Sequence, residues 1–103
     1  MSKAAFLRKR IKAVQVDDQT LHVRPLTGAQ LEHFIANESD ERLDGVRALS
    51  VVCCYCACDE TGARLFTDDD LQQIREEADF AMVKAVAEAA LDLSGLGDHT
   101  GNG

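Results

Sequence analysis

The chain has 103 residues, of which 46% are apolar and 28% are charged. This size and composition fit one globular domain with a single hydrophobic core. No apolar run is long enough to span a bilayer, and the basic start is not followed by the apolar stretch of a signal peptide. We therefore expect no membrane association, a place in the cytoplasm, and reduced cysteines.

The formal net charge of −7 is distributed unevenly along the chain. Residues 1–12 carry five cations and no acids, which leaves −12 on the remainder. A basic arm could touch phosphates, but no aromatic platform or recognition helix accompanies it, and we expect no nucleic-acid partner. We expect residues 1–12 to be a mobile basic arm, residues 13–96 a single helical domain with an N-terminal β-hairpin, and residues 97–103, which have nothing to bury, a disordered tail.

A β-hairpin is expected first. Apolar and polar residues alternate over 13–16 and over 20–24, on either side of a polar turn at 17–19. Pro25 prevents further pairing, because it has no N–H to donate. A hairpin of two strands is marginal in water, so it must pack on the helices or pair with another subunit. The side chains expected to face inward are Val14, Val16, Leu21 and Val23, and those expected to face solvent are Gln15, His22 and Arg24.

Two helices should follow the hairpin. Residues 27–30, Thr-Gly-Ala-Gln, have the spacing of a capping box and open a helix that runs to about Ala36. Ser39 or Asp40 can cap the next helix, whose apolar positions keep helical spacing from Leu43 to Cys56. A rival interpretation makes residues 50–58 a strand, because they are rich in β-formers. The longer periodicity that starts at Leu43 favours the helix.

Residues 59–70 combine a turn, an apolar pair and a helix start. Thr61 and Gly62 are typical of a turn, and three successive aspartates lie where a new helix dipole is positive. The aspartates could suggest calcium, but no Asp-x-Asp-x-Asp-Gly loop surrounds them. The stretch also holds one pair of large apolar side chains, which should enter the core. We therefore expect a structural anchor formed by Leu65, Phe66 and the helix cap Thr67.

The last two helices are predicted after this anchor. Leu71, Ile74 and Ala78 indicate a short helix, and a longer one should run from Asp79 to Leu93 and stop at Ser94-Gly95. The charged residues of the longer helix form one narrow stripe, which leaves most of its circumference apolar. Such a helix is either central in the monomer or presents one face to a partner. The candidate partner-binding side chains are Phe80, Val83, Val86, Leu91 and Leu93.

Together these elements predict a mainly α fold with a small N-terminal β-hairpin (α+β), with about four helices packed as a small bundle. Four cysteines, Cys53, Cys54, Cys56 and Cys58, suggest a zinc site, but on a helix only Cys54 and Cys58 share a face, so packing as small buried side chains is favoured. The histidines are scattered, and no nucleophile has a recognisable partner. We expect no catalytic, cofactor or metal site, and no enzyme.

The order of these signals resembles that of the tail assembly chaperones of long-tailed (siphophage-type) bacteriophages and prophages. Three stretches carry the resemblance, and together they span most of residues 14–97. The first is the hairpin that runs into Val-Arg-Pro-Leu-Thr-Gly-Ala-Gln at 23–30. The second is Cys-Asp-Glu-Thr-Gly-Ala-Arg-Leu-Phe-Thr-Asp-Asp-Asp at 58–70. The third is the closing Leu-Asp-Leu-Ser-Gly-Leu-Gly at 91–97.

The resemblance implies a protein that binds the phage tape measure protein, keeps it soluble in the host cytoplasm and helps tail tube protein assemble around it. Such a protein is absent from the mature virion, and in many members a translational frameshift appends a second domain. The apolar surplus of the last helix independently suggests a homo-oligomer or a partner helix. Two alternatives stay open on the residues alone: a small cytosolic helical adaptor with another client, and a thiol-based metal-binding regulator.

Overall fold

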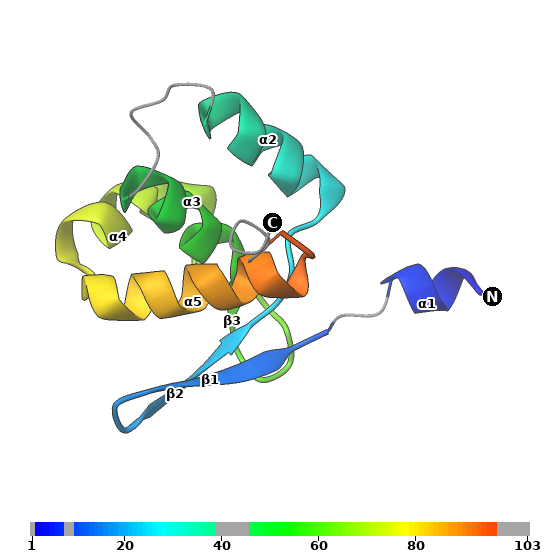
Figure 1. Cartoon of the computed structure of the whole chain (residues 1–103), viewed down its shortest axis with the longest axis horizontal. Coiled ribbons are helices and arrows are strands. Elements are labelled where there is room, and N and C mark those ends of the chain that lie inside the picture. Colours follow the sequence, from blue (N-terminus) through cyan, green and yellow to red (C-terminus); the bar gives the residue numbers. More distant parts are fainter. Residues whose placement is uncertain (1, 8–9, 39–45, 97–103) are drawn as a thin grey trace.

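The structure is a computed structural model that describes residues 2–7, 10–38 and 46–96 (Figure 1). The predicted fold class, mainly α with a small N-terminal β-hairpin, is confirmed. The elements in chain order are α1 (Lys3–Leu7), β1 (Lys12–Val16), β2 (Gln19–Val23), α2 (Gly28–Glu38), α3 (Val46–Cys56), β3 (Ala57–Cys58), the 3₁₀ helix η2 (Asp68–Asp70), α4 (Leu71–Glu77) and α5 (Phe80–Leu93).

The helix α5 lies at the centre of the molecule. It packs most extensively on α3 and also contacts both strands of the hairpin. Figure 1 shows α5 between these two layers, with α2, α3 and α4 on one side and the hairpin on the other. Of the two positions considered for this apolar helix, the structure therefore has the central one.

The hydrophobic core is built on α3 and the inner face of α5. Every residue from Ser50 to Cys58 is buried. Val52 and Cys56 are 0% exposed, and so are Ala87 and Ala90 on α5. Because alanine has so short a side chain, these two positions allow α3 to lie close to α5.

The predicted hairpin forms and gains a third strand. Val14 pairs with Leu21 across the antiparallel ladder, and both pack against the core. Asp17 takes the turn with φ 56°, a conformation that aspartate tolerates better than most residues. The short strand β3 pairs with β2, which gives the order β1-β2-β3. Of the two possibilities considered for the hairpin, the structure thus shows packing on the helices, and β3 adds pairing that was not predicted.

Two predicted helix ends are confirmed by their hydrogen bonds. At the start of α2, Thr27 N–H donates to Gln30 Oε1 (3.0 Å) and Gln30 N–H donates to Thr27 Oγ1 (3.2 Å), which is a complete capping box. At the end of α5, Gly95 has φ 83° and the N–H of Leu96 donates to the carbonyl of Leu91 (2.7 Å). This is a Schellman motif, in which glycine takes the left-handed position.

Several expectations need correction or lie outside the described residues. Within the basic arm, which was expected to be mobile, residues Lys3–Leu7 form the helix α1. The helical interpretation of residues 50–58 is right as far as Cys56, but Ala57 and Cys58 form a strand. The predicted caps Ser39 and Asp40, position 43 and the tail 97–103 fall outside the described residues. Among the helices that are described, none has the length and hydropathy to cross a membrane.

Candidate partner-binding site

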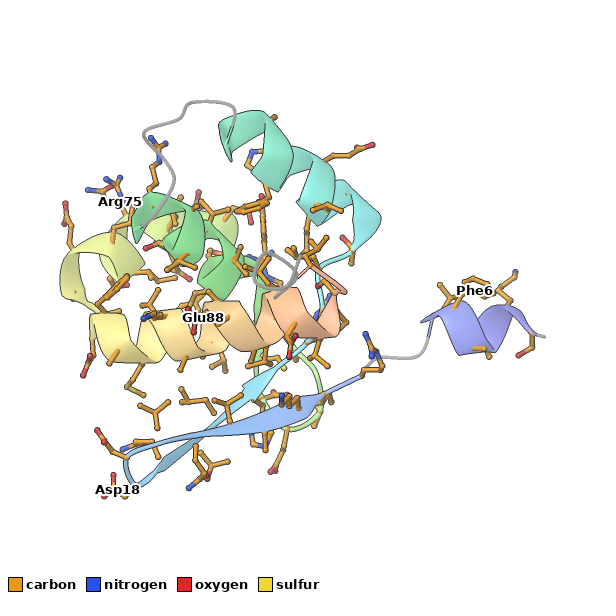
Figure 2. The ribbon with its side chains drawn as sticks, in the orientation of Figure 1. Phe6, Asp18, Arg75 and Glu88 are labelled. Atoms are coloured by element: carbon orange, nitrogen blue, oxygen red, sulfur yellow. The ribbon has the colours of Figure 1, made fainter. Side chains whose placement is uncertain are left out.

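An apolar pocket of about 260 Å³ opens between the hairpin, the segment at 65–66 and the corner where α4 meets α5. Five segments of the chain build its wall, and nearly all the lining side chains are apolar. Figure 2 shows the side chains that fill the space between α5 and the two strands. The lining residues are Leu21, His22, Cys53, Ala57, Leu65, Phe66, Ile74, Ala78, Asp79, Met82, Val83 and Val86.

The turn at 59–63 brings one wall of the pocket into place. Oδ1 of Asp59 accepts hydrogen bonds from Thr61 N–H (2.8 Å), Thr61 Oγ1 (2.6 Å) and Ala63 N–H (3.1 Å). The hydrogen bond from the Thr61 hydroxyl, followed by those from the backbone, lowers the pKa of Asp59. Gly62 supplies the positive φ of 93°. The chain then returns alongside β3, where Leu65 N–H donates to the carbonyl of Ala57 (3.0 Å).

The predicted anchor divides into an inner and an outer residue. Phe66 is half-buried and packs against the core, whereas Leu65 is 57% exposed. The expectation that both side chains enter the core is therefore wrong for Leu65. Thr67 does start the next helix in a capping-box arrangement: the Asp70 carboxylate accepts from Thr67 N–H at 2.8 Å and from Thr67 Oγ1 at 3.3 Å. Both residues of the apolar pair line the pocket.

The five side chains predicted to bind a partner do not form one surface. Val83 and Val86 are 4% and 3% exposed, so they are buried in the monomer, where they form part of the pocket wall. Leu91 and Leu93 are half-buried against the core. Phe80 is 43% exposed and follows Asp79, which lines the pocket. Of the five, Phe80 is thus the exposed one, and Val83 and Val86 are accessible to a partner only as part of the pocket wall.

Eight of the twelve pocket residues were not among the site residues predicted from the sequence. Among them, Leu21 was assigned to the inward face of the hairpin and His22 to its solvent side. His22 is half-buried because its strand pairs with β3, opposite Cys58. That pairing joins residues 36 positions apart in the sequence, so no local sequence pattern predicts it. Period-two alternation correctly placed these residues on the hairpin but could not say what covers either face.

A polar cluster ties the loop at 64–68 to α3. The Arg64 guanidinium lies 5.4 Å from the centre of the Tyr55 ring, donates to the carbonyl of Cys54 (3.0 Å) and pairs with Asp68 (3.2 Å). The Tyr55 hydroxyl is in turn hydrogen-bonded to Nδ1 of His33 on α2. The Arg64–Asp68 pair is local, but the contacts of Arg64 with α3 and of Tyr55 with His33 join the loop to α3 and α3 to α2.

The four cysteines are buried and do not converge on one point. Burial raises the pKa of Cys53 to about 11 and that of Cys56 to about 12, so both thiols are protonated at neutral pH. The thiol of Cys54 donates to the carbonyl of Thr67 (3.2 Å). The described residues contain no group of three or more His, Cys, Asp or Glu side chains arranged to hold a metal ion. Protonated buried thiols pack as small apolar side chains.

Comparison with known proteins identifies the family. A family model described as "Phage tail assembly chaperone, TAC" matches residues 1–90. The chain belongs to this family. A similar solved structure is that of the bacteriophage HK97 tail assembly chaperone, with a TM-score of 0.67 and 24% identity over 90% of this chain and 91% of that chain. At this identity the likeness establishes a shared fold. No match was found among curated proteins. The family resemblance seen in the sequence is thereby confirmed.

Proposed function

We propose that this phage tail assembly chaperone binds the tape measure protein, keeps it soluble and assists assembly of the tail tube, and that it is absent from the finished virion. The observation that carries the proposal is the open apolar pocket in a member of this family. The proposed place of action is the cytoplasm of the infected bacterium. In this role the protein acts by binding and catalyses no reaction.

A chaperone of this kind needs apolar surface that its own core does not use. The pocket meets this need, because its floor belongs to the core while Leu65 on its wall is 57% exposed. Phe80, which follows the pocket residue Asp79 in sequence, is a further exposed apolar side chain. Each large apolar side chain that a client buries here contributes about 1.5–3 kcal/mol to binding. A few such contacts give reversible binding, which suits a client that must later be released into the tail.

The shape and charge of the site favour a helical client. The pocket lies between a helix and a hairpin, and its lining is almost wholly apolar, as in sites that accept one face of an amphipathic helix. Asp79 stands at its edge, and Asp59 and Glu60 line an adjoining depression of about 400 Å³. We therefore expect the bound segment to show apolar residues at helical spacing with basic residues beside them.

The test is co-expression with the tape measure protein of the same phage, with the soluble fraction of that protein as the readout. Co-expression of the wild-type chaperone should raise this soluble fraction. Leu65→Asp places a charge on the pocket wall at an exposed position and should lower the soluble fraction towards that seen without chaperone. Leu96→Asp is the matched control, because Leu96 is 40% exposed and lies outside the pocket.

Two results would contradict the proposal at different points. If the wild type leaves the tape measure protein insoluble, the proposed client is wrong. If Leu65→Asp and Leu96→Asp both act as the wild type does, the client is right but the pocket is not its site. Circular dichroism must first show that both variants are folded. Mass spectrometry of purified virions tests the proposed absence of the chaperone from the particle.

A further inference from the structure

The N-terminal helix α1 exposes two large apolar side chains that the described part of the chain leaves largely uncovered. Phe6 is 76% exposed and Leu7 is 70% exposed, and no residue of α1 is buried. Figures 1 and 2 show α1 standing apart from the rest of the molecule, with Phe6 on it. A helix of five residues is far shorter than helices that are stable alone in water. It therefore needs a surface to pack on.

We propose that α1 of one copy packs, through Phe6 and Leu7, into the apolar pocket of a second copy. The proposal is independent of the identity of the client. It commits the pocket to a second occupant, a segment of this same chain, and so makes self-association and client binding compete for one site.

The complementarity of arm and pocket supports this occupant. The pocket offers an almost wholly apolar lining to the two apolar side chains. Residues 1–12 carry +5, while Asp79 stands at the pocket edge and Asp59 and Glu60 line the adjoining depression. The two hollows share Leu21, His22 and Leu65, so apolar wall and acidic rim form one continuous surface. In the arm, the apolar residues Phe6 and Leu7 are followed by cations, so the apolar side chains can enter the pocket while the cations lie at the acidic rim.

The arm's own pocket is a poor destination for α1. The Arg10 guanidinium donates to the carbonyl of Leu93, which holds the arm at the C-terminal end of α5. Phe6 and Leu7 border the groove beside residues 24–28, and neither lines the pocket of its own copy. A second copy can receive α1 as a helix without any change in this attachment of the arm.

A shallow groove of about 460 Å³ between α1 and residues 24–28 is the competing destination. Phe6 and Leu7 border this groove yet remain largely exposed. If the arm closed onto this groove in solution, the protein would stay monomeric at every concentration. Exchange between copies instead predicts a mass that rises with concentration, so the two destinations are distinguished by one measurement.

The experiment is sedimentation velocity of the full chain over a wide concentration range. The wild type should associate, and Leu96→Asp should associate as the wild type does. Phe6→Asp removes the arm contact and Leu65→Asp damages the pocket. Each should raise the dissociation constant on the order of 10- to 100-fold. High salt should weaken wild-type association, because the arm and the rim carry opposite charges.

Mixing the two defective variants gives the decisive result. Phe6→Asp retains an intact pocket and Leu65→Asp retains an intact arm, so the mixture should form complexes that neither variant forms alone. A mixture that stays monomeric, with both variants folded by circular dichroism, would overturn the proposal, as would a wild type that never associates. Phe6→Asp should still keep a co-expressed tape measure protein soluble if that is the client. Failure of the arm exchange and failure of the proposed function are thus separate outcomes.

Discussion

Replacing Ala87 with leucine tests the central position of α5 most directly. Ala87 is 0% exposed on the face of α5 that enters the core. Leucine adds three carbon atoms where the neighbouring side chains are already in contact, and overpacking of this kind costs about 1–3 kcal/mol. In a domain of this size, 1 kcal/mol lowers Tm by roughly 4–8 °C. We therefore expect Ala87→Leu to melt on the order of 5–20 °C below the wild type.

The matched control is Ala81→Leu, on the same helix. Ala81 is exposed, and leucine and alanine have similar helix propensities, so its Tm should stay within a few degrees of the wild type. Thermal unfolding followed by far-UV circular dichroism measures both. If the two variants melt together, or if Ala87→Leu melts at the wild-type temperature, then α5 does not lie against α3 as closely as the structure shows.

Three further predictions concern the thiols and one cap. In the folded protein the pKa of Cys53 is raised to about 11 and that of Cys56 to about 12, so as pH rises these thiols ionise in the unfolded chain before they ionise in the folded one. Denaturant titrations should therefore show the full free energy of unfolding below about pH 9 and a progressive loss of it as pH rises towards 11 to 12. At neutral pH a thiol reagent should react slowly with the native protein and quickly with all four cysteines after unfolding; fast native reaction would refute their burial. Asp79→Ala removes the acceptor for Ala81 N–H (2.9 Å) and should cost about 1 kcal/mol in urea unfolding, whereas Asp79→Asn should retain most of it.

The elements predicted correctly from the sequence are those whose signal is local. The capping box of Thr27 and Gln30 and the glycine stop at Gly95 are short motifs whose hydrogen bonds join near neighbours. The hairpin likewise needs only alternation around a turn. The strand β3 has no such signal, because two residues form a strand only when β2 lies beside them, with Val23 opposite Ala57. Its presence depends on the fold as a whole.

The candidate site was predicted less well. The sequence pattern of α5 tells which way each side chain points around the helix, but not which other element packs against that side. Counting apolar faces left two possibilities for the helix: a central position in the monomer, or one face presented to a partner. It could not show that the hairpin covers the second face, which buries Val83 and Val86. The pattern also did not show that Ala87 and Ala90 are fully buried in the core.

The error at Leu65 has a simple geometric cause. Cys58 and Arg64 form an antiparallel bridge, and Leu65 N–H bonds to the carbonyl of Ala57, so the chain is extended as it enters this pair. Successive side chains of an extended chain point to opposite sides, and two neighbours cannot both enter one core. Phe66 packs inward and Leu65 is left at the surface, on the wall of the pocket. The residue that fails as an anchor is therefore the one best placed to meet a partner, which is why both proposals are tested at Leu65.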